Sequence, residues 1–257
     1  MSTTFDELVI EGDSVPVAGW DFSWFDGRAT EERPAWGYAR LIAERIGRAR
    51  AVLDVQTGGG EVLATAVQAS TTRPSVLAAT ESWPPNAELA RSNLATLGGR
   101  VAEVADEADL PFAAATFDLV VSRHPVVTVW PEIGRVLQPG GTYLSQQIGA
   151  GSNRELIDFM MGPQQVGTAR STRRAVAQAG EAGLEVVDLR EQALRLEFFD
   201  VAAVVYFLKK VLWTVPGFTV ARYREPLRRM HEHIVANGKF VCHAQRFLIE
   251  ARKPLNG

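Results

Sequence analysis

Cysteine, long apolar runs and net charge are all scarce in this sequence of 257 residues, and each scarcity excludes a class of protein. It has one cysteine, Cys242, which excludes an internal disulfide and favours a reducing compartment. No apolar run reaches the length of about 18 residues that a membrane-spanning helix needs. The formal net charge is only −3, so the sequence carries no electrostatic footprint for nucleic acid. We therefore expect a soluble, cytoplasmic protein that binds neither membrane nor nucleic acid.

Leader and metal signals are also missing. The start of the chain, Met1 to Glu7, has no basic leader. No cysteine and histidine spacing suits zinc, and His231 and His233 are two positions apart on a predicted helix, so they do not face each other. We expect no metal site.

Apolar residues make up 46% of the chain, and their distribution predicts alternating strands and helices. Strands are expected near 51–55, 75–80, 100–104, 117–121, 142–147, 184–195 and 240–251. Helices are expected near 60–70, 84–96, 126–137, 153–161, 172–182 and 220–237. This alternation predicts an α/β fold with a doubly wound, mostly parallel sheet and helices on both faces.

The segment from Val52 to Glu61 is the most informative part of the sequence. An apolar run is followed by three glycines, Gly58 to Gly60, and then by an amphipathic helix. Such a turn lets the backbone approach a ligand closely, and the helix start offers free N–H groups. Leu63 replaces the third glycine of a dinucleotide fingerprint, and no Gly-Lys-Ser/Thr follows. A ligand without a phosphate is favoured, and Asp54 favours one with a positive charge.

S-adenosylmethionine (SAM) has both properties, and the segment resembles motif I of class I SAM-dependent methyltransferases of the type 11-like group, D/E-x-G-x-G-x-G. Asp54, Gly58 and Gly60 match the motif, whereas Gln56 stands where the family usually has its first glycine. Gln56 must adopt a backbone geometry that glycine adopts more easily. The resemblance implies a Rossmann-like fold and SAM as cofactor, with Gln56 and Thr57 also in contact with it.

Two acidic positions further along extend the resemblance. Glu81 ends the second expected strand 21 residues after Gly60, where an acidic side chain can bind ribose hydroxyls, and Ser82 lies beside it. Asp106 and Glu107 precede a Leu-Pro-Phe sequence, as in the family's acidic loop. The resemblance implies that Asp106 takes the adenine amino group and that the backbone N–H of Glu107 faces a ring nitrogen.

Two more segments complete the resemblance, which covers roughly residues 51 to 150. Phe117 to Ser122 resembles the family's fourth strand, and the resemblance implies cofactor contacts by Ser122 and Arg123. Arg135 to Gly141 resembles its R-x-L-x-P-G-G turn, where Pro139 is expected to stop the helix. The family closes a seven-stranded sheet with an antiparallel last strand, which we expect here near 240–251.

The segments outside this core are expected to choose the substrate. We predict a helical and aromatic amino-terminal cap over 1–48, a SAM-binding core over 49–197 and 239–257, and a helical insertion over 198–238 that acts as a substrate lid. Aromatic residues are frequent in residues 20–38 and 206–218, so we expect these segments to meet over the carboxyl edge of the sheet, around an apolar cavity. The predicted substrate-binding residues are Trp24, Arg28, Tyr38, Tyr206 and Trp213.

His124 is the candidate catalytic residue. The methyl group of SAM is already activated, so its transfer chiefly needs positioning, but a hydroxyl or protonated amine acceptor also needs a base. His124 follows the fourth strand, and histidine is usable near neutral pH. Alternatively, His124 only orders the loop or contacts the cofactor. Arg123 is expected to pair with an acidic substrate group or with Glu132.

The sequence thus predicts a methyltransferase that acts on a small-molecule acceptor, O- or N-directed, as a monomer or homodimer. One alternative is an RNA-modifying methyltransferase, which the charge disfavours. The other is a SAM-binding protein that does not transfer the methyl group, an alternative that Gln56 keeps open.

Overall fold

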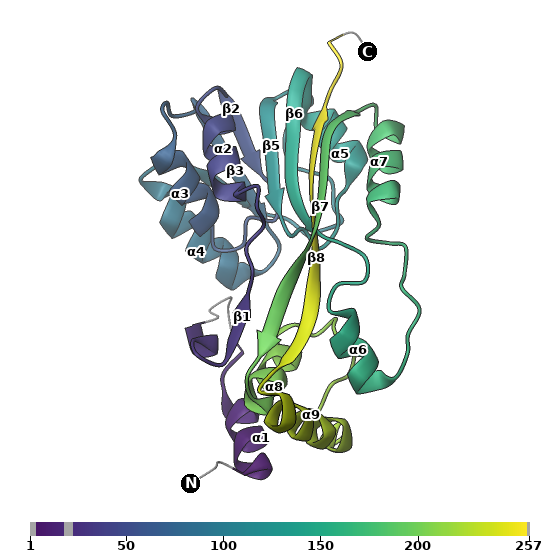
Figure 1. Ribbon diagram of the computed structural model, residues 1–257. Helices are drawn as coiled ribbons and strands as arrows, with labels where there is room; N and C mark the ends of the chain where they lie inside the picture. Colours follow the sequence, from purple (N-terminus) through teal and green to yellow (C-terminus); the bar gives the residue numbers. More distant parts are fainter. Residues whose placement is uncertain (1–3, 18–22, 256–257) are drawn as a thin grey trace. The chain divides into compact units, whose positions relative to one another are not determined.

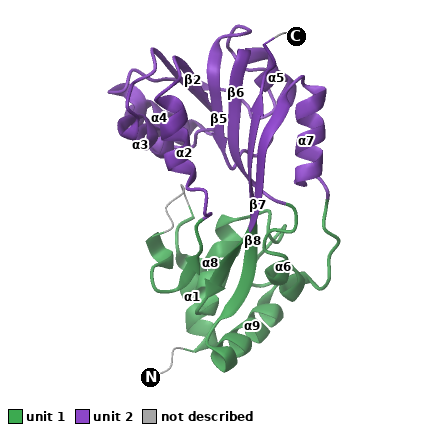
Figure 2. Cartoon of the chain, turned by 45° about the horizontal axis from the view of Figure 1, so that its top comes forward, with its two compact units in different colours: residues 1–33, 150–167, 193–245 green, residues 34–149, 168–192, 246–257 purple. Residues whose placement is uncertain are grey.

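The computed structural model describes residues 4–17 and 23–255, and contacts divide the chain into two compact units (Figure 2). Unit 1 consists of residues 1–33, 150–167 and 193–245, and unit 2 of residues 34–149, 168–192 and 246–257. Residues 34–48 therefore group with the core rather than with the predicted cap, and residues 150–167 group with the predicted insertion. Trp20, in the aromatic segment, lies outside the described residues.

The described strands form one eight-stranded sheet, labelled in Figure 1, in the order β1-β7-β8-β6-β5-β2-β3-β4. Their bounds are β1 Ala29–Glu31, β2 Ala51–Asp54, β3 Val76–Glu81, β4 Arg100–Glu103, β5 Phe117–Arg123, β6 Leu137–Ile148, β7 Glu185–Phe198 and β8 Phe240–Arg252. Strands β4, β3, β2, β5 and β6 are parallel, while β8 pairs antiparallel with β6. The α/β class and the antiparallel last strand are confirmed. The expected number of seven strands is corrected to eight, because the short β1 pairs with β7.

Helices connect these strands at the positions that the apolar periodicity predicted, with three helices that it did not predict. The bounds are α1 Phe5–Ser14, α2 Tyr38–Ile46, α3 Glu61–Ala69, α4 Pro84–Ala95, α5 Trp130–Val136, α6 Arg154–Met161, α7 Thr172–Glu181, α8 Val201–Lys210 and α9 Arg224–Asn237, with a 3-10 turn η1 at Ser23–Phe25. The bounds of α1, α2 and α8 were not predicted, although α1 and α2 lie in the expected helical cap and α8 lies in the expected helical insertion.

In unit 2 the sheet buries both faces, because side chains alternate along each strand. Val52 and Leu119 belong to a cluster with α2 and α3, whereas Leu53 and Val120 belong to a second cluster with α5 and α7. Figure 1 shows these two pairs of helices on opposite sides of β2, β5 and β6. Continuous apolar strands are typical of a parallel sheet covered on both sides, so the carboxyl ends of the strands are the part of the sheet left for a ligand.

Unit 1 has its own core. Its buried cluster joins α1, α6, α8 and α9 to the ends of β7 and β8, with Phe198, Leu208 and Leu227 fully buried. Thr4 begins α1 with a capping box, in which its hydroxyl accepts from the Glu7 N–H and the Glu7 carboxylate accepts from the Thr4 N–H. Strands β7 and β8 each contribute residues to both units.

The turn between α5 and β6 differs from the prediction. The helix already ends at Val136, and β6 begins at Leu137, so Pro139 does not stop the helix. Residues 138–141 instead belong to the strand, and the pairing of β6 with β5 shifts register opposite Phe117–Leu119. A proline is compatible with such an irregular strand segment because it needs no ladder donor there.

Candidate functional site at the carboxyl edge of the sheet

The glycine-rich turn between β2 and α3 has the backbone geometry that its sequence requires. Gln56, Gly58 and Gly60 all have positive φ, at 58°, 64° and 79°. A Cβ atom at Gly60 would lie 3.2 Å from the Ala90 Cα, so α4 packs directly against the turn. A Cβ at Gly58 would meet nothing within 4 Å, so the turn leaves open space there for a ligand. Gln56 thus holds the left-handed conformation that its position predicted.

Hydrogen bonds fix this turn to the end of β3. The Thr57 N–H donates to the Thr80 carbonyl at 2.9 Å, and the Gly58 N–H donates to Glu81 Oε2 at 2.8 Å. Glu81 Oε1 accepts a second bond from the Trp83 N–H at 3.0 Å. The Glu81 side chain is buried, and two backbone donors hold it in place. A carboxylate has about four acceptor positions, so Glu81 keeps acceptor capacity for ligand hydroxyls.

Asp54 is buried at the end of β2 beside the same turn. The Thr57 hydroxyl donates to Asp54 Oδ2 at 2.6 Å. The pKa of Asp54 is raised to about 7, mainly by burial and also by the nearby Glu81 carboxylate, while the Thr57 hydroxyl and Arg123 oppose the shift. A cation bound nearby would stabilise the ionised form of this group.

The Gln56 side chain ties the turn to the loop after β5. Its Oε1 accepts from the Val126 N–H at 2.6 Å, and its Nε2 donates to the Val127 carbonyl at 2.8 Å. Glycine at this position would have neither bond. The side chain therefore acts here as a bridge between two loops of the site.

The acidic loop before β5 is anchored by an ion pair on α5. Glu132 and Arg135 are joined by contacts of 2.6 Å, which lower the pKa of Glu132. Glu132 Oε2 accepts from the Leu110 N–H, and Arg135 donates to the carbonyls of Leu110 and Phe112. The expected pairing of Arg123 with Glu132 is therefore wrong, because Arg135 occupies that role. This ion pair determines where the chain after Asp106 runs.

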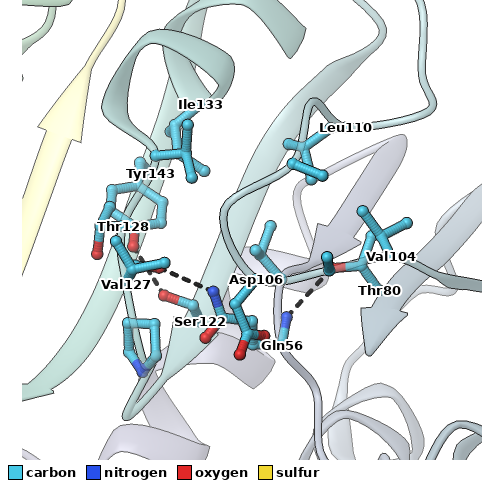
Figure 3. Close-up of a pocket in the computed structure, with 15 residues that line it drawn as sticks. Gln56, Thr80, Val104, Asp106, Leu110, Ser122, Val127, Thr128, Ile133 and Tyr143 are labelled. Carbon is cyan, nitrogen blue, oxygen red and sulfur yellow. Dashed lines mark hydrogen bonds between the residues drawn. The ribbon is translucent and has the colours of Figure 1, made fainter. Parts of the chain in front are cut away.

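These loops surround a small cavity, shown in Figure 3, to which Gln56, Thr80, Asp106 and Ser122 contribute. It encloses about 20 Å³, which is room for about one water molecule. Ligand pockets usually measure about 300–1,000 Å³. This cavity can hold only part of a ligand, and the turn leaves further open space beside Gly58.

His124 lies in the loop after β5, half-buried, with a positive φ of 55°. Its Nε2 is 2.9 Å from Gln146 Nε2, and its backbone N–H donates to the Gln146 carbonyl. Burial, together with the cations Arg246 and Arg123, lowers the pKa of His124 to about 3. An imidazole of such low pKa is a weak proton acceptor near pH 7.

Most of the predicted cofactor residues come together at this edge. Asp54, Thr57, Gly58, Gly60 and Glu81 form the turn and its anchor, as described above. Asp106 and Ser122 line the cavity, Ser82 is half-buried beside Glu81, and Glu107 and Arg123 are exposed. Their contacts with a cofactor stay predictions.

Four of the predicted substrate residues, Trp24, Arg28, Tyr206 and Trp213, belong to unit 1. The Trp24 and Tyr206 rings are 5.0 Å apart, so the two aromatic segments do meet, and the Arg28 guanidinium lies 4.5 Å from the Trp24 ring. Arg28 also pairs with Glu11 and Asp200. That these segments cover the sheet edge stays a prediction.

Tyr38, the fifth of these residues, belongs to unit 2, where it is buried and donates from its hydroxyl to the Ser122 carbonyl at 2.8 Å. This contact ties α2 to the end of β5.

No direct signal in the sequence predicted the polar end of β6. The Ser122 hydroxyl bonds with the Tyr143 hydroxyl at 2.7 Å and with the Ser145 hydroxyl at 2.8 Å, and Gln146 bridges His124 and Trp36. Two glutamines in a row at the end of an apolar strand are the signal that could have indicated these residues.

Comparison with known proteins agrees with this geometry. Residues 53–145 match the family model described as a methyltransferase domain. These residues form a methyltransferase domain of the SAM-dependent family. Among proteins with curated descriptions, none matches the sequence significantly.

Solved structures similar to this methyltransferase share its fold at low sequence identity. A protein from Bacillus halodurans C-125, provisionally assigned as a methyltransferase, is 19% identical with a TM-score of 0.58, over 86% of this chain and 99% of that one. Geranyl diphosphate methyltransferase in complex with SAM is 15% identical with a TM-score of 0.51, over 84% of each chain. The [4+2]-cyclase SpnF is 16% identical with a TM-score of 0.51, over 85% of this chain and 81% of that one.

The residues present fit SAM, the cofactor of the family. Gly58 leaves open space over the turn, and Glu81 and Asp106 supply carboxylates for hydroxyl and amino donors. Asp54 supplies a third carboxylate for a positive charge. The described residues contain no group of three or more side chains suited to a metal ion, and none of the described helices is long and apolar enough to cross a membrane.

Proposed function

We propose that this methyltransferase transfers the methyl group of SAM to an oxygen or nitrogen atom of a small organic acceptor. The charge of the site supports a small acceptor. Asp54, Glu81 and Asp106 place three carboxylates at the sheet edge, with Arg123 as the nearby exposed cation. A polyphosphate chain such as RNA would be repelled by this arrangement, because nucleic-acid sites need clustered positive charge.

The single observation that carries the proposal is the anchoring of the glycine-rich turn by Glu81. Its carboxylate holds the Gly58 N–H at 2.8 Å, next to the open space over Gly58. A buried carboxylate fixed at a ligand-accessible turn is suited to orient ribose hydroxyls. SAM would supply an activated methyl group at this place, and the protein would supply orientation.

The acceptor class is supported by two structural neighbours whose names refer to small molecules. One is geranyl diphosphate methyltransferase. The other, from Galdieria sulphuraria, is provisionally assigned as a sarcosine dimethylglycine methyltransferase and is 17% identical, with a TM-score of 0.51 over 86% of this chain and 84% of that one. The aromatic cluster of Trp24, Phe25 and Tyr206 in unit 1 is our candidate for binding the apolar part of the acceptor.

The role of His124 as a general base stays a prediction, and two observations weigh against it. Its Nε2 is already engaged with Gln146, and its pKa is lowered to about 3. A base of that strength contributes little to removal of a proton from a hydroxyl group.

Calorimetry with SAM and with its demethylated product S-adenosylhomocysteine tests the proposal, followed by transfer of labelled methyl groups to panels of alcohols, amines and RNA. We expect micromolar binding and transfer to a member of the small-molecule panels. Glu81→Ala should weaken binding by roughly 1–3 kcal/mol, because the Gly58 and Trp83 donors lose their charged partner. No heat at millimolar cofactor, or transfer to RNA alone, would contradict the proposal.

A second function is favoured by one observation, the strained Gln56 that bridges two loops of the site. A protein that binds SAM without transferring its methyl group tolerates a residue that is strained and ties the turn to a neighbouring loop. The similarity to a [4+2]-cyclase shows that this fold also serves other chemistry. Cofactor binding without methyl transfer to any acceptor panel would support this alternative.

A further inference from the structure

Three side chains of unit 2, Trp36, Gln146 and His124, form a hydrogen-bond chain whose direction is fixed. The Trp36 indole N–H can only donate, and it lies 2.8 Å from Gln146 Oε1. The Gln146 amide therefore presents its NH₂ group on the other side, 2.9 Å from His124 Nε2. Because that NH₂ group only donates, the imidazole Nε2 must accept. The chain runs from Trp36 through Gln146 to His124.

This direction determines the tautomer of His124. With Nε2 as acceptor, the ring proton of the neutral imidazole is on Nδ1. Protonation of Nε2 would place an N–H against the amide NH₂. Rotation of the amide would relieve that clash only by turning the NH₂ group toward the Trp36 N–H. Trp36 and Gln146 are 6% and 3% exposed, so water does not readily replace either bond.

The charged groups around His124 also favour the neutral form of its imidazole. Arg123 at the end of β5 and Arg246 on β8 are the charged groups near the ring, and both disfavour a positive imidazolium. From β6, the neutral side chain of Gln146 faces the ring, and Trp36 bonds to the other end of that amide. Within the described part of the chain, no residue accepts a hydrogen bond from His124 Nδ1.

We propose that Trp36 and Gln146 are positioning residues that hold His124 as a neutral hydrogen-bond donor, and that its Nδ1–H binds an oxygen atom of a reactant. The oxygen belongs either to the carboxylate of the cofactor or to the methyl acceptor. His124 thus orients a reactant instead of removing a proton. This inference rests on the proposed function, since it needs the reactants at this edge of the sheet.

Nitrogen-15 NMR of the histidine rings tests the tautomer without any ligand. We expect His124 to show a protonated Nδ1 and an unprotonated Nε2, with no titration between pH 5 and 8. A protonated Nε2, or a titration near the usual histidine pKa, would overturn the proposal. This measurement does not depend on methyl transfer.

Gln146→Glu is the variant that reverses the direction of the hydrogen bond between residue 146 and His124. One carboxylate oxygen still accepts from Trp36, while the other now accepts from His124 Nε2, so the ring should take its proton on Nε2 and titrate at higher pH. Gln147→Glu is the matched control, because it adds the same charge one residue further, where the side chain contacts Thr128 and Ser145. An unchanged His124 spectrum in Gln146→Glu would contradict the proposal. If Gln146→Glu does not fold, Trp36→Phe frees the amide to rotate, and His124 should then titrate.

Two binding measurements distinguish the source of the oxygen. If it is the cofactor carboxylate, Gln146→Glu should weaken S-adenosylhomocysteine binding about tenfold relative to Gln147→Glu, but not the binding of 5′-methylthioadenosine, which lacks the carboxylate. If it belongs to the acceptor, cofactor affinity should be equal in the two variants, and kcat/KM for an acceptor from the panels should fall about 10²-fold at saturating SAM. No difference in either measurement would overturn the donor role. Failure of the wild-type protein to bind SAM would instead reject the proposed function, while the NMR result on the tautomer would stand.

Discussion

At the scale of single residues, Gln56 combines an unfavourable backbone with two favourable contacts. Its φ of 58° is strained for a residue with a side chain, but its amide bonds to both Val126 and Val127. Gln56→Gly should relieve the strain and lose both bonds, so these effects oppose each other. We expect the affinity for SAM, measured by calorimetry, to change by less than about tenfold, or roughly 1.4 kcal/mol.

Ala115→Gly is the control for Gln56→Gly. Ala115 also has a positive φ, 52°, but it is exposed in the turn before β5. The variant Ala115→Gly should change the stability of the protein and leave its affinity for SAM unaltered. A gain of several hundredfold in Gln56→Gly alone would show that the natural protein is a weakened cofactor binder, which contradicts the proposed transferase function.

Asp54 should make cofactor binding depend on pH. Burial raises its pKa to about 7, so below that pH the free protein carries a neutral Asp54. A cationic cofactor favours the ionised form, so binding lowers this pKa and releases a proton. SAM affinity should therefore increase as pH rises toward 7 and level off above about pH 8. Calorimetry across pH 5.5 to 8.5 measures this, and Asp54→Asn should flatten the profile. A profile that stays equally steep in Asp54→Asn would remove Asp54 from this role.

At the scale of elements, α5 determines the course of the acidic loop through Arg135. Arg135→Leu should free the carbonyls of Leu110 and Phe112 and leave Glu132, whose side chain is 10% exposed, without its cation. We expect stability to fall by roughly 1–3 kcal/mol in denaturant unfolding, because buried groups lose their partners. SAM affinity should also fall, since Asp106 is on the loosened loop. Arg174→Leu, at an exposed position of α7, is the control and should change neither quantity.

The stabilisation by the ion pair of Glu132 and Arg135 should decrease in acid. The pKa of Glu132 is lowered by its bonds to Arg135, so the folded state favours the ionised carboxylate. The contribution is present above the ordinary glutamate pKa and is lost as pH falls through the lowered value. The stability difference between the wild-type protein and Arg135→Leu should therefore shrink in acid.

Most elements could be predicted from the sequence because their signals are local. The strands β2, β3, β5 and β8 begin and end within about two residues of the expected positions, since apolar runs and glycine or proline residues bound them. The bounds of α8 were not predicted, although a helical insertion was expected there. Its residues, Val201 to Lys210, are buried on nearly all sides, so no broad polar face marks the helix in the sequence.

At the scale of the whole molecule, neither unit is a continuous segment. The chain passes from one unit to the other at residues 33, 149, 167, 192 and 245. Each unit therefore needs segments whose ends are fixed in the other, and we expect a single cooperative unfolding transition. Leu208→Ala in the unit 1 core should cost roughly 2–5 kcal/mol and lower the Tm of the entire chain, as measured by calorimetry. Leu89→Ala, at a 46% exposed position of α4, is the control. Two separate heat peaks would contradict this expectation.

The sequence by itself determined the fold class, the composition of the glycine-rich turn and, through the family resemblance, the cofactor. Gly58, Gly60, Glu81 and Asp106 could be recognised because the geometry of a strand–turn–helix unit and the spacing of acidic residues are local properties. Even the positive φ of Gln56 followed from its place in the motif.

Only the tertiary structure decided what these side chains contact. The bridge from Gln56 to Val127, the anchor of Arg135 on Leu110, and the chain from Trp36 to His124 join residues separated by 71, 25 and 88 positions. A pattern of residue types cannot indicate such pairs, because only tertiary packing brings these distant segments together. Whether a histidine accepts or donates a proton depends on these partners and on burial, and not on its place in the sequence.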